Sequence, residues 1–125
     1  MGAKTVLVVD DSRIMRNIVK NTFLSMNIPC EFIEASTGKE ALVRLDNNAI
    51  DLVLLDWNMP ELSGLDFLKQ ARSNPLHKDL PIIMITSEAA RYNVIEALKN
   101  GATDYIIKPV NEKTFQQKLA KLHLK

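Results

Sequence analysis

The sequence contains one cysteine, Cys30, and this excludes an internal disulfide. It also lacks an excess of charge of either sign, since 16 lysines and arginines against 15 aspartates and glutamates leave a formal net charge of +1. So small a net charge gives no general attraction to nucleic acid or to a membrane surface, and we expect neither as a partner. Because Cys30 opens an apolar stretch, we expect its thiol to be buried rather than reactive.

Long apolar runs are missing as well. None approaches the ~20 residues that are needed to cross a bilayer. The start, MGAKTVLVVDD, lacks the architecture of a signal peptide, because its short apolar stretch runs directly into two acids. We therefore expect a cytoplasmic protein. The 125 residues, 46% of them hydrophobic, suit one compact domain that spans residues 1–125.

Short runs rich in β-branched residues and leucine alternate with longer stretches of helical period. Strands are expected at residues 5–9, 30–35, 51–56, 81–86 and 104–109, each followed by a helix. The third run is almost wholly apolar, as in a central parallel strand, whereas the second alternates apolar and acidic residues, as at a sheet edge. Five such units predict an α/β fold with a doubly wound, five-stranded parallel sheet and helices on both faces.

Caps and apolar spacing define the helices. Thr37 and Glu40 have the spacing of a capping box, and Gly101 is placed to end the fourth helix. The spacing predicts these side chains in the core: Ile14, Met15, Ile18, Val19, Thr22, Phe23 and Met26; Ala41, Leu42 and Leu45; Leu65, Leu68 and Ala71; Ala90, Val94, Ala97 and Leu98; Phe115, Leu119 and Leu122.

Polar side chains follow four of the five expected strands. They are Asp10 and Asp11 after the first strand, Asp56 after the third, Thr86 after the fourth and Lys108 after the fifth. Parallel strands end at one edge of the sheet, where ligands bind at the point at which strand order reverses. We therefore expect these five residues at one rim, with the first and third strands adjacent.

Three carboxylates held close together raise one another's pKa and need a cation to remain ionised. Mg²⁺ suits them, because it prefers oxygen ligands and keeps several waters, and no His or Cys lies at these strand ends. Asp11 and Asp56 could bind the ion directly, Asp10 through water, and the backbone carbonyl of Asn58 could complete the protein's share. Lys108 and Thr86 would then face a phosphoryl group, which indicates phosphoryl transfer to Asp56.

Four motifs resemble those of a known family. VVDD (8–11), LLDWNMP (54–60), MITS (84–87) and YIIKP (105–109) are similar to the motifs of response regulator receiver domains in two-component signalling, and the resemblance covers essentially the whole chain. It implies a flavodoxin-like (βα)5 fold with strand order 2-1-3-4-5, one receiver domain with no output domain, and a cis Lys108-Pro109 bond. It also implies that Asp56 takes phosphate from a sensor histidine kinase, with Mg²⁺ held by Asp10 and Asp11 and with Lys108 on the phosphoryl group.

The resemblance also implies a switch. The Thr86 hydroxyl would move toward the phosphoryl group and Tyr105 would turn into the vacated space, changing the surface of the fourth helix, fifth strand and fifth helix. Otherwise, Thr86 is an ordinary strand residue and Tyr105 a half-buried aromatic.

Within the family, the chain is most similar to stand-alone chemotaxis response regulators. Trp57 follows the acceptor directly, and Asn58 and Glu88 stand where they would tune dephosphorylation; Ser87 departs from the frequent alanine. A monomer is expected, with the flagellar motor switch as target and a phosphatase as a further partner. A phosphate sink or a relay for another pathway is the alternative.

A metal-dependent phosphohydrolase also uses an aspartate at a strand end. It usually has an acid two residues after the nucleophile, where this chain has Asn58. We therefore favour a phosphorylated switch that is not itself an enzyme in the ordinary sense.

Several further charged residues lie outside these motifs. Arg13 and Arg16 are expected on the exposed face of the first helix, where they could guide a kinase. Lys118 and Lys121 either meet an acidic partner or form a solvated face, and Asp51 is expected in solvent. His77 and His123 are read as surface residues rather than phosphorelay histidines.

Overall fold

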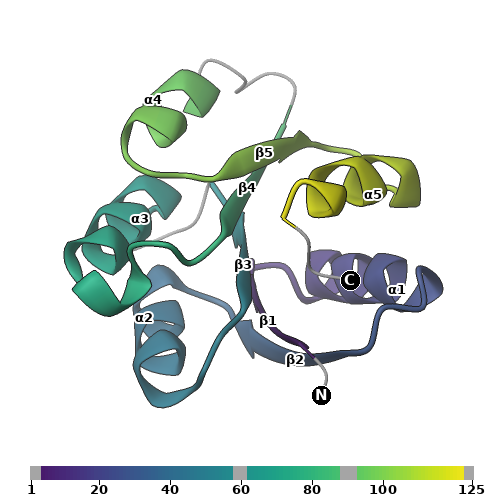
Figure 1. Cartoon of the computed structure of the whole chain (residues 1–125), viewed down its shortest axis with the longest axis horizontal. Coiled ribbons are helices and arrows are strands. Elements are labelled where there is room, and N and C mark those ends of the chain that lie inside the picture. Colours follow the sequence, from purple (N-terminus) through teal and green to yellow (C-terminus); the bar gives the residue numbers. More distant parts are fainter. Residues whose placement is uncertain (1–3, 58–61, 88–92, 123–125) are drawn as a thin grey trace.

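The fold is a five-stranded parallel sheet between two layers of helices (Figure 1). The computed structural model describes residues 4–57, 62–87 and 93–122. The strands are β1 (Lys4–Val9), β2 (Cys30–Ala35), β3 (Leu52–Asp56), β4 (Ile82–Thr86) and β5 (Asp104–Ile107). Their order is β2-β1-β3-β4-β5. The predicted fold class and strand order are confirmed.

The helices cover both faces of the sheet, as right-handed crossovers require (Figure 1). The helices α1 (Arg13–Ser25) and α5 (Glu112–Ala120) pack on one face. The helices α2 (Gly38–Asn47), α3 (Gly64–Ser73) and α4 (Asn93–Lys99) pack on the other. A 3-10 turn, η1 (Pro75–His77), follows α3. Among the described residues, no helix is long and apolar enough to cross a membrane.

Two apolar cores form because alternate strand residues point to opposite faces. All five residues of β3 are buried, as predicted for a central strand, and its side chains enter both cores. Most of β2 is only half-buried, which agrees with its predicted place at the sheet edge. Phe67 and Phe115 are fully buried on opposite sides of the sheet.

Both predicted caps are present. Thr37 Oγ1 accepts a hydrogen bond from the Glu40 amide at 3.0 Å, while the Glu40 carboxylate accepts one from the Ser36 amide at 2.7 Å, one residue before the usual capping-box partner. Gly101 has a φ of 106°, a conformation that favours glycine. The amides of Gly101 and Ala102 donate to carbonyls in the last turn of α4, so the helix ends in a Schellman motif.

The predicted core face of α1 is too wide. Ile14 is 73% exposed and Ile18 is 41% exposed, whereas Val19 and Phe23 are buried. A helix meets a sheet along a narrow stripe, and Ile14 and Ile18 lie one position around the helix from it. In α4, Val94 and Ala97 face the core but Leu98 is 43% exposed. The predicted core position 90 lies outside the described residues.

Two further expectations need correction. Cys30 is half-buried rather than buried, although burial together with the charge of Asp51 raises the pKa of its thiol, in keeping with an unreactive group. Asp51 is not free in solvent. It is half-buried, and its Oδ2 accepts a 2.8 Å hydrogen bond from the Thr5 amide, which ties the start of β3 to β1.

Candidate functional site

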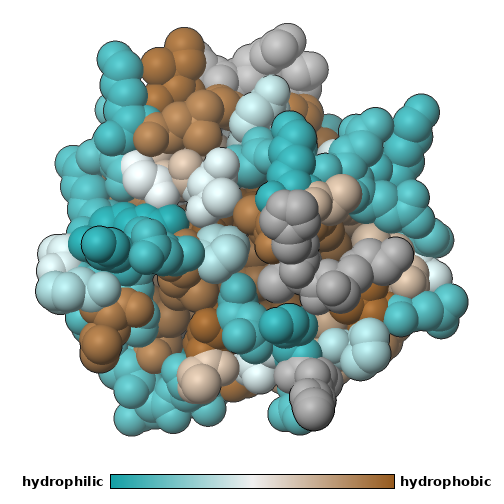
Figure 2. Space-filling view, in the orientation of Figure 1, coloured by the Kyte–Doolittle hydropathy of each residue, from teal (hydrophilic) through white to brown (hydrophobic). Residues whose placement is uncertain are grey.

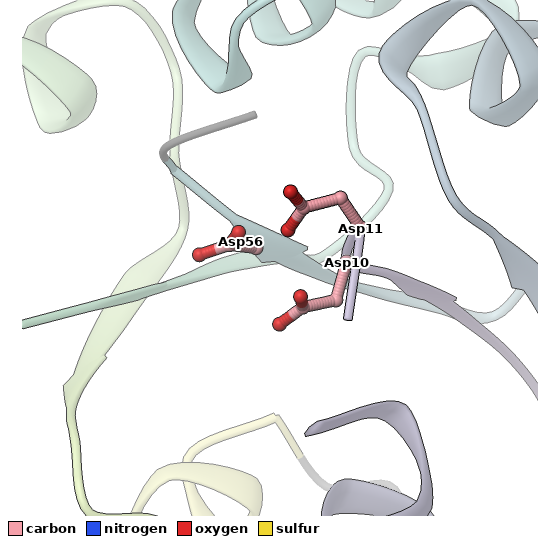
Figure 3. Close-up of side chains that lie close together, drawn as sticks. All are labelled: Asp10, Asp11 and Asp56. Atoms are coloured by element: carbon pink, nitrogen blue, oxygen red, sulfur yellow. The ribbon is translucent and has the colours of Figure 1, made fainter. Parts of the chain in front are cut away.

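Three carboxylates meet at the rim of the sheet where the strands end (Figure 3). Asp10 and Asp11 follow β1, Asp56 ends β3, and one oxygen of each lies within 4.8 Å of the others. Asp10 and Asp56 are only 5% and 6% exposed, whereas Asp11 is exposed. The structure therefore brings together the three acids that the sequence placed at one rim.

The register of the sheet explains this arrangement. Strands β1 and β3 are parallel neighbours with Val9 opposite Leu55, so the residues that follow, Asp10 and Asp56, lie side by side. The turn after β1 is held by the start of α1. Ser12 caps that helix, and its amide donates a 2.8 Å hydrogen bond to Asp10 Oδ1.

Lys108, which directly follows β5, supplies a positive charge to the site. Its Nζ lies 3.4 Å from Asp56 Oδ1, and its side chain is 31% exposed. The Lys108 amide donates to the Thr86 carbonyl at 2.8 Å, which links the end of β4 to the chain after β5. The Lys108-Pro109 bond is cis, as the family resemblance implied.

The acids repel one another and are poorly hydrated. Burial and the nearby charge of Asp10 raise the pKa of Asp56 to about 6, even though the charge and hydrogen bond of Lys108 act to lower it. Burial also raises the pKa of Asp10, against the hydrogen bond from the Ser12 amide. A divalent cation that favours carboxylate oxygens would relieve this repulsion, so the donor set fits Mg²⁺.

Thr86 has an orphaned hydroxyl. The residue is 1% exposed at the end of β4, and its Oγ1 has no hydrogen-bond partner among the described residues. Leaving a buried hydroxyl unpaired costs about 1–3 kcal/mol. Tyr105 lies on the neighbouring strand β5, opposite Met84, and is half-buried. The two residues of the expected switch are thus on adjacent strands.

Trp57 lies buried directly after β3. It is 5% exposed, and its carbonyl accepts a 3.2 Å hydrogen bond from the Gly64 amide. A Cβ at position 64 would lie 2.8 Å from the Trp57 ring atom Cε3, closer than side chains allow. Glycine at the start of α3 therefore lets that helix pack directly on Trp57.

Other residues considered from the sequence lie outside the described part of the chain or away from the acids. Asn58, proposed as a carbonyl ligand, and Glu88, proposed with Asn58 to tune dephosphorylation, lie outside the described residues, as does His123. His77 lies in η1 before β4, at the opposite end of the strands from the acids.

Arg16 and Lys118 have specific partners within the chain. Arg16 is only 15% exposed and donates hydrogen bonds to the Asp10 carbonyl at 2.7 Å and to Glu34 Oε1 at 2.8 Å. Lys118 is 17% exposed and pairs with Asp104 Oδ1 at 2.9 Å. Helical period alone cannot reveal such partners, although the acid at position 34 of the neighbouring edge strand was a usable signal for Arg16.

Comparison with known proteins decides the family. Residues 6–120 match the response regulator receiver domain. The chain belongs to this family of receivers. It is 48% identical over 115 residues to chemotaxis protein CheY1 of Helicobacter pylori, covering 91% of this chain and 92% of that protein. It is 42% identical to a CheY homologue of Campylobacter jejuni, with 91% and 88% covered.

A solved structure agrees with this assignment. The receiver superposes on chemotaxis protein CheY4 of Vibrio cholerae with a TM-score of 0.84 and 32% identity, covering 96% of this chain and 98% of that one. Receivers of this kind are signalling proteins rather than classical enzymes. The predicted family and its two-component signalling role are confirmed.

Proposed function

We propose that this receiver is a chemotaxis response regulator that is phosphorylated on Asp56. The observation that carries the proposal is the cluster of Asp10, Asp11 and Asp56 with Lys108 Nζ 3.4 Å from the central carboxylate. A buried acid with this pKa and these partners is suited to a chemical role.

In the proposed reaction, an Asp56 carboxylate oxygen attacks the phosphorus of a phosphohistidine on a sensor kinase. The new O–P bond replaces the N–P bond, and the histidine leaves as imidazole after taking up a proton. Lys108 faces the developing negative charge on the phosphoryl oxygens. Water later attacks the phosphorus, the O–P bond breaks, and the products are inorganic phosphate and the original carboxylate.

Asp10, Asp11 and Asp56 would hold Mg²⁺, which neutralises charge between the acids and the phosphoryl oxygens when it is bound. Asp56 is held by β3 and flanked by Asp10, which follows β1, so its carboxylate is oriented before the phosphoryl donor arrives. The Asn58 carbonyl belongs to the proposed ligand set, and the Asn58 and Glu88 side chains to the proposed control of hydrolysis.

Phosphorylation would be felt through Thr86. The phosphoryl group adds roughly two negative charges and new acceptor oxygens, and the orphaned Thr86 hydroxyl can donate to one of them. Tyr105 would then turn inward and alter the surface of α4, β5 and α5. Differential contacts worth a few kcal/mol move such an equilibrium substantially.

The target would bind that surface. Figure 2 shows hydrophobic atoms over α4, where Ile95 is 64% exposed and Leu98 is 43% exposed. Because its relatives are chemotaxis proteins, we propose the flagellar motor switch as the target. We further propose a sensor histidine kinase as phosphate donor, a phosphatase as an additional partner, and a cytoplasmic, monomeric protein.

The proposal is tested by adding acetyl phosphate and Mg²⁺ while Trp57 fluorescence is recorded. The signal should change in the wild type, return as the phosphoryl group is hydrolysed, and be lost in Asp56→Asn, whose amide keeps the shape but cannot accept the group. Asp66→Asn, at an exposed acid of α3, is the matched control. Steady turnover of simple phosphate esters would instead favour a phosphohydrolase.

A further inference from the structure

Arg16 connects the edge of the sheet to the acidic cluster. Its Nη1 donates a 2.7 Å hydrogen bond to the Asp10 carbonyl, and its Nε donates a 2.8 Å bond to Glu34 Oε1 on β2. The guanidinium of this α1 residue thus contacts both the end of β1, at the Asp10 carbonyl, and β2, at Glu34. Its side chain is only 15% exposed, although the helical pattern placed it in solvent.

The Asp10 carbonyl needs this donor because the sheet ends beside it. Strands β1 and β2 pair up to Val9 and Ala35, and the Asp10 amide still donates to the Ala35 carbonyl at 3.0 Å. Beyond Ala35 the chain turns toward α2, which Thr37 caps. No further residue of β2 is in place to donate a backbone hydrogen bond to the Asp10 carbonyl, and the Arg16 side chain donates one instead.

Glu34 holds Arg16 in place. It receives hydrogen bonds from Arg16 and, at 2.7 Å, from Lys20 Nζ, and these bonds lower the pKa of its carboxyl. Ionised partners give shorter and stronger hydrogen bonds than neutral ones. The planar fork of a guanidinium can meet the Asp10 carbonyl and Glu34 together, which the single ammonium of a lysine cannot do with the same geometry.

We propose that Arg16 is a positioning residue for the metal site. Its bond to the Asp10 carbonyl, braced by Glu34, fixes the turn that carries Asp10 and Asp11 opposite Asp56. The inference rests on the proposed function, because it assumes that these acids bind Mg²⁺. The ion demands nearly ideal octahedral geometry, so a small displacement of one acid weakens binding. Groups that orient metal ligands from behind commonly change metal affinity when they are replaced.

The test is Mg²⁺ affinity, measured by calorimetry without a phosphoryl donor. Arg16→Met removes both donors while keeping an unbranched apolar stem. Lys20→Met is the matched control, because it removes the same charge from the same helix and another bond to Glu34 but leaves the Asp10 carbonyl bonded. We expect the dissociation constant to rise about tenfold in Arg16→Met. In Lys20→Met it should stay within about twofold of the wild type.

Thermal unfolding of each variant identifies a temperature at which all of them are folded. Mg²⁺ affinity is measured at that temperature, so that a loss of stability is not mistaken for a loss of affinity. If Arg16→Met does not fold, Glu34→Gln takes its place, since it keeps the hydrogen-bond acceptor but removes the charge that holds Arg16. A rise in its dissociation constant beyond that of Lys20→Met supports the inference.

Equal affinities in the wild type and the tested variant overturn the inference while leaving the proposed function intact. If the wild type itself does not bind Mg²⁺, both the inference and the proposed function are overturned. The titration of the wild type alone shows whether this is the case. A merely structural role predicts lower stability with unchanged affinity of the folded protein.

Discussion

The ammonium group of Lys118 lies over the ring of Tyr105, with Nζ 4.2 Å from the ring centre. The same Nζ lies 2.9 Å from Asp104 Oδ1, and that oxygen also accepts a 2.8 Å hydrogen bond from the Tyr105 amide. Lys118 on α5 therefore contacts both the backbone anchor and the side chain of the tyrosine on β5. The tyrosine of the proposed switch is thus held by a residue of α5.

Replacing Lys118 should loosen Tyr105. In Lys118→Met, the loss of the cation–π contact and the ion pair should lower the free energy of unfolding by about 1 kcal/mol. Urea unfolding measures the stability, and NMR exchange broadening of the Tyr105 ring measures its motion. Lys121→Met removes the same charge at an exposed position of the same segment and should change neither quantity. Equal effects in both variants would contradict a specific clamp.

Thr86→Val should separate stability from signalling. Valine has nearly the same shape and removes a buried hydroxyl that has no partner among the described residues, so the free energy of unfolding should stay equal or rise by about 1 kcal/mol. The phosphorylated variant should nevertheless bind its target more weakly, because no hydroxyl is left to contact the phosphoryl group. Urea unfolding and pull-down with beryllofluoride, a phosphate mimic, measure the two properties. A clear loss of stability would mean that the hydroxyl is hydrogen-bonded.

The raised pKa of Asp56 makes stability depend on pH. The pKa is 3.8 for an ordinary aspartate and about 6 in the folded protein, so ionisation favours the unfolded chain. The folded protein therefore has its full stability from protonated Asp56 below pH 3.8, and it loses this stability as the pH rises through about 6. In magnesium-free buffer, Asp56→Asn should exceed the wild type in stability at pH 8, on the order of 2 kcal/mol. At pH 4 the two should be nearly equal.

Urea unfolding at these pH values checks this prediction, with Asp66→Asn as a control at an exposed acid. Adding Mg²⁺ should reduce the difference in stability between Asp56→Asn and the wild type at pH 8. A ligand that binds the folded wild type stabilises it by mass action. If Asp56→Asn and the wild type differ in stability by the same amount at pH 4 and pH 8, ionisation of Asp56 is excluded as the cause of the difference.

Gly64→Ala should disturb the packing around Trp57, next to the proposed acceptor Asp56. An added methyl group would approach both the Trp57 ring and its backbone, the latter at 2.9 Å. Overpacking of this kind typically costs about 1–3 kcal/mol. Urea unfolding and the Trp57 emission wavelength check it, and Ser73→Ala at the exposed end of the same helix is the control. An unchanged emission spectrum would show that the helix moves away without disturbing the tryptophan.

The sequence predicted the fold because its strongest patterns are also the physically decisive ones. The unbroken apolar run of β3 is typical of a central strand, and the mixture of acidic and apolar residues in β2 is typical of an edge. Asp10, Asp11 and Asp56 could be placed together for a general reason: parallel strands end at the same rim, whatever their neighbours are.

Contacts between elements could not be predicted in this way. Ile14 and Ile18 fit the helical period as well as Val19, but the width of the contact with the sheet decides which of them is buried. Arg16 follows the same period as a solvated residue, yet it is turned inward because the ladder between β1 and β2 stops at Ala35. Such partners depend on where a neighbouring element ends.

The central claim is tested most directly by mapping the phosphoryl group. The protein is incubated with acetyl phosphate and Mg²⁺, digested at low pH, and its peptides are sequenced by mass spectrometry. We predict a single added phosphoryl group on Asp56, absent without Mg²⁺ and absent in Asp56→Asn. A label on any other side chain, or no label while Mg²⁺ is bound, would contradict the account.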